Sequence, residues 1–303
     1  MPIVGLMLSI AALGNLIQSY GNGYKSIAGA LATIIFIVVT IKFLCDFKTL
    51  KKELETPIGA SVFPTYTMGM MLLATYLKPY QSQIAFGVWI VAILLHLVLM
   101  VYFTAKFVKN FNIMQVFPSW FIVYVGIAVA SVTGKAFQQN IGQFAFYFAL
   151  LSYLILLPIV TKRVLFIKKF PEPALPTLII FSAPGSLCLA GYINSFDTKN
   201  LLLFWILLVL SQAIYILALV KLVQLLRLPF YPSYSGFTFP LVISAIALKT
   251  STAFLIGQNY SVACLPLLVK AEELVAVLIV LYVFIRYVCH IVKLTCNKGV
   301  SNT

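Results

Sequence analysis

Long apolar runs separated by short polar links dominate this chain. Ten of these runs are compatible with the roughly 17–25 residues that a membrane-spanning helix needs. The predicted spans are residues 2–19, 24–45, 58–77, 84–105, 118–134, 141–161, 175–193, 200–222, 234–252 and 270–291. The first is short and is interrupted by Gly5 and Gly14. The pattern predicts an all-α, polytopic membrane protein that forms one transmembrane domain over residues 1–303.

Prolines recur at matching depths in three of the odd-numbered spans. The pairs are Pro57 and Pro64, Pro176 and Pro184, and Pro232 and Pro240. In each pair the second proline falls about 12 Å beyond the helix entrance, at ~1.5 Å of rise per residue. Proline there removes a backbone hydrogen bond and kinks the helix. Broken helices at mid-membrane are tolerated where they are buried in protein or line a watery path, so we predict a conduit built from kinked helices.

The charges predict an orientation. The chain is 62% hydrophobic and only 9% charged, which is too little charge for the surface of a soluble domain. The net charge of +14 comes from short basic clusters, most of which follow the even-numbered spans. We interpret these clusters as positive-inside signals and contacts with membrane lipid, not as a nucleic-acid-binding surface. Both termini are then cytoplasmic, and the chain forms five helical hairpins.

Odd and even spans differ in composition. Odd spans follow the basic links and often begin at a proline, for example Pro118, whereas even spans such as 84–105 and 200–222 are more uniformly apolar. We therefore predict an inner ring of five kinked odd helices around a central pore, enclosed by an outer ring of five even helices. Repeats around a mid-membrane discontinuity are typical of transport proteins. The five cysteines have no CxxC spacing, and free thiols are expected.

Five stretches on the odd spans carry a family resemblance. They are GLMLSIAALGNL, ASVFPTYTMGMMLLATYLKP, FPSWFIVYVGIAVASVTG, PEPALPTLIIFSAPGSLCLAGY and FYPSYSGFTFPLVISAIALK. In this order and spacing they resemble the tellurite-resistance/dicarboxylate transporter (TDT) family, which includes bacterial TehA, yeast malate permeases, sulfite efflux pumps and plant slow anion channels. The resemblance implies ten helices with quasi-fivefold symmetry and a homotrimer with one pore in each subunit.

The resemblance also implies a gate. In channel members a phenylalanine just before the kink of the ninth helix plugs the pore, and Phe239 in FTFPL occupies that place. The expected pore-lining or kink positions are Phe63, Pro64, Thr65, Gly126, Ala183, Pro184, Thr238 and Pro240. Two departures from the family stand out. Gly126 is present where TehA has a mid-helix proline, and Lys249 lies ten residues beyond Phe239.

Phe63 precedes Pro64 as Phe239 precedes Pro240, so it either contributes to the same constriction or packs in the core. At the equivalent position Ala183 would leave room beside a ring. Near the kinks, hydroxyl groups either line the pore or satisfy the backbone at the breaks. These residues are Ser61, Thr65, Ser119, Ser182, Ser186 and Thr238.

Three interior polar positions have competing interpretations. Lys249 either attracts anions at the outer mouth, or pairs with Glu272 or Glu273, or extends to the interface. His96 lies on an even span, where a packed neutral imidazole is favoured over a proton relay. The chain lacks HExxH, P-loop and GxSxG motifs, so we expect neither an enzyme nor a cofactor or metal site.

Two transport hypotheses follow. The first is passive flux of small anions, or of C4-dicarboxylates such as malate, through a Phe-gated pore in the cell membrane. The second is a proton-coupled secondary transporter of a dicarboxylate or oxyanion such as malate or sulfite, or a tellurite-related efflux protein. Its only plausible titratable groups are His96, Glu272 and Glu273. An inert membrane scaffold or a membrane enzyme is the third, different class of function.

Overall fold

The computed structural model describes residues 2–260 and 262–300, with side chains before residue 295, and that part of the chain contains helices and no strand. Nine of its helices are long and apolar enough to cross a membrane. These nine correspond to every predicted span except 118–134. The all-α membrane architecture is therefore confirmed, whereas the fifth predicted span is not one continuous helix.

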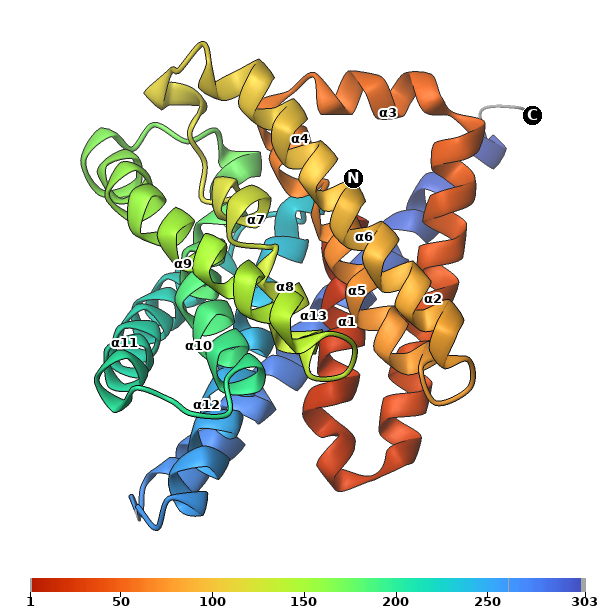
Figure 1. The fold of residues 1–303 in the computed structure, drawn as a ribbon. Coiled ribbons are helices and arrows are strands. Elements are labelled where there is room, and N and C mark those ends of the chain that lie inside the picture. Colours follow the sequence, from red (N-terminus) through yellow and green to blue (C-terminus); the bar gives the residue numbers. More distant parts are fainter. Residues whose placement is uncertain (1, 261, 301–303) are drawn as a thin grey trace.

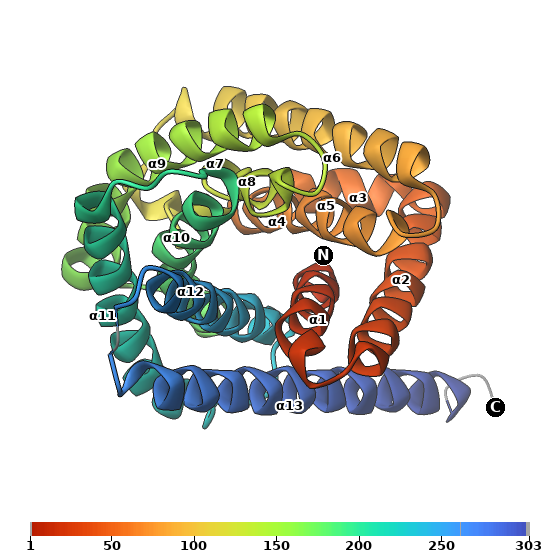
Figure 2. The ribbon, with the colours of Figure 1, turned by 60° about the horizontal axis from the view of Figure 1, so that its bottom comes forward.

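The helices form two concentric layers (Figure 2). The inner layer contains α1 (Ile3–Leu16), α4 (Pro57–Val62) with α5 (Thr65–Leu77), α7 (Trp120–Tyr124) with α8 (Ala128–Gly134), α10 (Ala183–Ser195) and α12 (Thr238–Gly257). The outer layer contains α2 (Asn22–Cys45), α6 (Ser82–Phe103), α9 (Gln139–Thr161), α11 (Leu201–Leu225) and α13 (Leu265–Val300). In the inner spans that pass the length criterion, 67–83% of the residues are buried, against 22–39% in the outer ones. The outer layer therefore presents most of its apolar side chains outward, as a lipid-facing surface requires.

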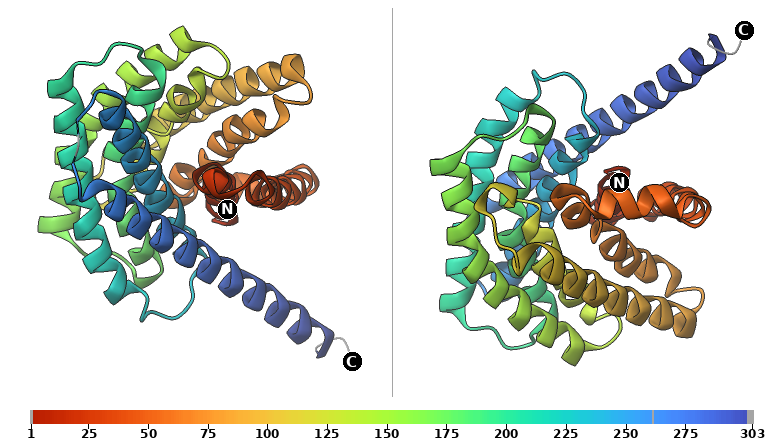
Figure 3. Two further views of the ribbon diagram at one scale, coloured as in Figure 1. Left: turned by 90° about the horizontal axis from the view of Figure 1, so that it is seen from below. Right: turned by 90° about the horizontal axis from the view of Figure 1, so that it is seen from above.

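A short helix marks one side of the bundle. This helix, α3 (Phe47–Leu54), carries Lys48, Lys51 and Lys52 and lies across the ends of the bundle (Figure 1). The helices α2, α6 and α9 all end toward it. We call this the basic side and the opposite end the far side. Figure 3 shows that the C-terminal part of α13 extends well beyond the rest of the bundle.

Each of the three proline pairs coincides with a break in an inner helix. Pro64 follows the end of α4 and precedes α5 directly. Pro184 lies in the first turn of α10, after a 3-10 segment (Glu172–Ser182), and Pro240 lies in the first turn of α12, after a second one (Pro232–Phe237). The first turn of a helix tolerates proline, because the missing N–H has no partner there in any case. Each of these three odd spans is consequently split just before its second proline.

The fifth predicted span, 118–134, breaks without a proline. Here α7 ends at Tyr124 and α8 begins at Ala128. A Cβ atom on Gly126 would lie 2.1 Å from the Ile122 carbonyl oxygen and 2.8 Å from the Met68 sulfur. Only glycine allows the backbone to approach this closely, so Gly126 takes the place that proline has in the other breaks.

Candidate functional site

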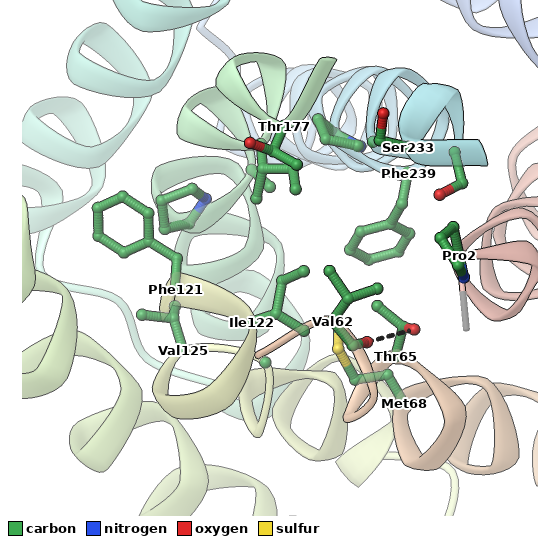
Figure 4. A pocket seen from close by; sticks show the side chains of 18 of the residues that line it. Pro2, Val62, Thr65, Met68, Phe121, Ile122, Val125, Thr177, Ser233 and Phe239 are labelled. Carbon is green, nitrogen blue, oxygen red and sulfur yellow. Dashed lines mark hydrogen bonds between the residues drawn. The ribbon is translucent and has the colours of Figure 1, made fainter. Parts of the chain in front are cut away.

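The breaks of the inner helices surround a cavity of about 60 Å³ on the basic side (Figure 4). We call it the basic-side cavity. Six of the positions singled out from the sequence line it, namely Thr65, Gly126, Ala183, Pro184, Phe239 and Pro240. Its other polar side chains are the hydroxyls of Thr177, Ser233 and Ser235, and none of its lining residues is charged. The breaks thus create an apolar chamber at the centre of the bundle.

A second cavity, of about 490 Å³, lies toward the far side. We call it the far-side cavity. Its lining is more polar and includes Asn15, Asn194 and Gln18 together with the two cations Lys25 and Lys249. No acidic side chain lines either cavity within the described residues. The far-side cavity therefore offers amide and ammonium donors to an anion.

Two side chains line both cavities: Phe239 and Leu187. Phe239 is 8% exposed, and Figure 4 shows its ring pointing toward Val62 and Thr65 on the opposite wall. Because both residues belong to both chambers, they form the partition between them.

His96 supports two of the breaks from the outer helix α6. Its Nε2 lies 3.1 Å from the Val123 carbonyl oxygen, and its Nδ1 lies 2.7 Å from the Thr67 hydroxyl. A carbonyl only accepts, so Nε2 carries a proton, while Nδ1 contacts a Thr67 hydroxyl that also lies 2.8 Å from the Pro64 carbonyl oxygen. In a continuous helix the donor to Val123 would be the amide of Ile127, which lies in the break. This arrangement agrees with the interpretation of His96 as a packed neutral residue.

Most of the hydroxyls near the kinks bond one another between neighbouring helices. The Ser61 and Ser119 hydroxyl oxygens are 2.6 Å apart, as are those of Ser9 and Thr238. Ser186 and Ser244 make a third such pair at 2.9 Å, while Ser182 donates to its own helix. Of the six hydroxyl residues singled out from the sequence, only Thr65 lines either cavity. Ser61, Ser119, Ser186 and Thr238 join neighbouring inner segments at the breaks, whereas Ser182 does not.

Phe63 lies at its break but outside both cavities. Its ring centroid is 5.3 Å from that of Phe43 on α2 and 5.8 Å from that of Tyr66. Pro64 and Thr238 are likewise absent from the lining of both cavities. These three positions lie at the breaks, and the packing of the Phe63 ring against Phe43 and Tyr66 corresponds to the second of its two interpretations, a core residue.

Lys249 is held in an ion pair. Its ammonium group lies 2.5 Å from a Glu273 carboxylate oxygen and also donates to the Leu16 carbonyl and the Ser19 hydroxyl. Glu273 also accepts a hydrogen bond from Tyr20. The pair connects α12 with α13 and the end of α1, so most of the charge on Lys249 is compensated. Lys25 makes no ion pair within the described residues and donates to Gln18 instead.

Sequence reasoning missed Leu187, although a positional signal existed. Leu187 follows Pro184 by three residues, just as Ile243 follows Pro240, and both line the far-side cavity. Val129 stands in the same relation to Gly126 and lines the same cavity. Counting three residues from Gly126, Pro184 and Pro240 would therefore have found this part of the wall, whereas the same count from Pro64 gives Thr67, which lines neither cavity.

Comparison with known proteins agrees with this arrangement of broken inner helices around two chambers. No curated protein matches the chain significantly. The model of a family described as voltage-dependent anion channel, SLAC1, matches residues 1–288, nearly the whole chain. That match confirms the resemblance found in the odd spans and identifies a membrane transport protein, not an enzyme. The chain is thus a multi-pass membrane protein that belongs to the SLAC1 voltage-dependent anion channel family.

Proposed function

We propose that anions cross the membrane passively through the two cavities and that Phe239 closes the passage between them. The observation that carries this proposal is that Phe239 and Leu187 each line both chambers. Two apolar side chains between two spaces form a constriction that excludes water, and an ion that keeps its hydration shell cannot pass. Rotation of the Phe239 ring into the basic-side cavity would open the passage without movement of a helix.

The lining favours anions. Lys25 and the amides of the far-side cavity place positive charge and donors at one mouth. The other chamber offers only hydroxyls and apolar groups, and neither lining contains a carboxylate within the described residues. Weak, dispersed donors release an ion readily, as conduction requires. The proposed substrates are small anions such as chloride and nitrate, with C4-dicarboxylates such as malate included.

The test is anion flux through purified protein in liposomes, measured for chloride, nitrate and malate at two pH values. Phe239→Ala is expected to raise the flux at least tenfold, by about the same factor at both pH values. Phe63→Ala is the matched control, because Phe63 is also 8% exposed, also precedes a proline and lines neither cavity. Equal flux in wild type and Phe239→Ala would refute the gate.

Proton-coupled transport is the second candidate, and one buried carboxyl group favours it. Glu272 is 6% exposed within α13, and one of its oxygens has no hydrogen-bond partner among the described residues. Ionisable groups inside a span are often proton sites. However, Glu272 lines neither cavity, so the channel is the better proposal. Malate uptake that follows an imposed pH gradient and is lost in Glu272→Gln would reverse this preference.

The proposed pathway implies a topology and an assembly. We infer that the chain crosses the membrane ten times as five hairpins and that both termini lie in the cytoplasm. In this topology α7 and α8 together form the fifth crossing. Cysteine labelling of the links on the two sides tests this topology. Family membership further suggests a homotrimer in which each subunit has its own pore. Crosslinking in mild detergent that gave only monomers would contradict the trimer.

A further inference from the structure

A groove on the outer surface lies apart from the two central cavities. It has a volume of about 850 Å³ and runs between the end of α9, its π-helical extension (Lys162–Ile167), the 3-10 segment Glu172–Ser182, and α11. Three lysines line it: Lys168, Lys169 and Lys221. Lys168 and Lys169 follow one even-numbered span, and Lys221 lies in the last turns of the next, α11, on the basic side. Charge is therefore concentrated in a groove whose remaining lining is almost entirely apolar.

The apolar part of the groove faces the membrane. Leu165 and Leu217 line it and are 58% and 68% exposed. Phe181 contributes an aromatic wall from the 3-10 segment. Leu165 and Leu217 belong to the outer layer of a membrane protein, so acyl chains of the bilayer cover them. The groove thus combines an apolar part that faces lipid with a cluster of three lysines near the membrane surface.

The lysine pair is held in an unusual backbone conformation. Lys168 and Lys169 have φ angles of 57° and 56°, in the left-handed region that non-glycine residues rarely adopt. Arg163 lies behind them, 1% exposed, with its guanidinium 4.1 Å from the Phe170 ring centre and one nitrogen donating to the Lys169 carbonyl at 3.2 Å. Strained conformations persist where the surroundings stabilise them, and they concentrate at ligand-binding sites.

The positive charge at this end has no acidic partner within the described residues. None of the three lysines is in an ion pair there, and Lys221 donates only to Gln224. Two further nitrogens of Arg163, Nε and Nη1, have no hydrogen-bond partner. Four cations around one end of a groove, one of them fully buried, create a site complementary to a negatively charged group.

We propose that this groove binds one anionic phospholipid of the cytoplasmic leaflet. Its phosphate group lies at Lys168, Lys169 and Lys221, and one acyl chain follows the apolar wall past Leu217. The lysines explain selection of an anionic over a zwitterionic headgroup, because basic residues at the membrane surface attract anionic lipid. The apolar wall explains why the ligand is a lipid and not a free anion.

The test is native mass spectrometry of the delipidated full chain, titrated with phosphatidylglycerol or phosphatidylcholine of the same acyl chains. Wild type is expected to bind one phosphatidylglycerol at least tenfold more tightly than phosphatidylcholine. The triple variant Lys168→Gln/Lys169→Gln/Lys221→Gln is expected to lose that preference, while the corresponding three Lys→Arg changes retain it. The matched control is Lys48→Gln/Lys51→Gln/Lys52→Gln, which removes the same charge from exposed positions on α3.

Three outcomes would overturn the proposal. Equal affinity of wild type for both lipids would mean that the groove does not recognise the headgroup. An equal loss in both glutamine triples would mean that the preference depends on total charge and not on this site. Displacement of phosphatidylglycerol by millimolar inorganic phosphate would mean that the site binds anions without the acyl chain. The first and third measurements use wild type alone, so they decide the question even if the triple variants fold poorly.

Discussion

Two identical dipeptides, Phe63–Pro64 and Phe239–Pro240, lie at equivalent helix breaks and have different surroundings. Both phenylalanines are 8% exposed, so burial does not distinguish them. The Phe63 ring packs against Phe43 and Tyr66, while the Phe239 ring points into the space between two cavities. The local Phe-Pro motif therefore creates the break, whereas the neighbouring helices determine which way the phenylalanine ring faces.

A nearby residue gives a physical reason for the difference. Phe237, three residues before Pro240, is fully buried, and its ring centroid is 4.7 Å from that of Tyr234. Phe237 therefore fills the packing space beside α12 and leaves Phe239 to face the cavity. The corresponding position before Pro64 is Ser61, whose side chain is too small for that task. Phe63 fills the space between α5 and α2 instead.

The largest expected contrast is in stability. Phe63→Ala removes a ring from an aromatic cluster and leaves a void, so it is expected to lower the free energy of unfolding by about 3 kcal/mol. Phe239→Ala enlarges an existing space and is expected to cost about 1 kcal/mol, since fewer contacts are lost. Unfolding of both purified variants in one detergent measures the difference. Equal losses would mean that both rings are packed alike.

A size series at position 239 sharpens the same contrast. Leucine at this position is expected to raise chloride flux about threefold and alanine at least tenfold, because a smaller side chain leaves a wider constriction. The same substitutions at position 63 are expected to leave the flux per folded protein unchanged. Liposome flux, normalised to the folded fraction, gives both series. A rise at position 63 that matches the rise at 239 would remove the distinction between the two rings.

Leu187→Ala extends the comparison to the second residue of the partition. Alone it is expected to raise flux about threefold, because the Phe239 ring still fills most of the constriction. In the double variant, Leu187→Ala is expected to raise the flux by less than threefold over that of Phe239→Ala alone. Residues that share one constriction do not act independently. A purely multiplicative effect in the double variant would place the two side chains at separate barriers.

The smallest expected effect comes from removing the charge of Lys25 in the far-side cavity. In the Phe239→Ala background, Lys25→Gln is expected to reduce chloride flux about twofold in dilute salt, because a cation at the mouth raises the local anion concentration. Near 1 M salt the reduction should disappear, as the screening length falls to about 3 Å. A reduction that persists at high salt would instead indicate direct binding at Lys25.

Much of the fold followed from the hydrophobic pattern, because spans and helix-breaking prolines are local signals. The sequence also indicated which spans are inner and which outer, since the even spans are uniformly apolar. The break at Gly126 was harder to predict, because it depends on close contacts with Met68 and with the carbonyl of Ile122. The pairing of Lys249 with Glu273 was one of the alternatives, and only helix packing could select it.

The residues of the candidate site were harder to predict, because their orientation depends on how each helix is rotated about its own axis. Composition places a hydroxyl near a break, but helix rotation decides whether it meets a cavity or another hydroxyl. Ser61 and Ser119 were therefore equally suited to both roles and turned out to bond each other. The same argument holds for His96, whose two partners come from different helices 27 and 29 residues away in sequence. Leu187 carried a positional signal, but no chemical one.

The neutrality of the partition between the two cavities has a consequence for electrical control. Phe239 and Leu187 carry no charge, and none of the lining residues of the basic-side cavity does either. A ring that rotates there transfers no gating charge across the electric field, whereas each elementary charge moved through 100 mV is worth about 2.3 kcal/mol. Rotation of the ring alone would therefore not depend on membrane potential, and any steep voltage sensitivity would have to arise from the permeating anion or from charged groups outside the partition, such as those of the far-side cavity.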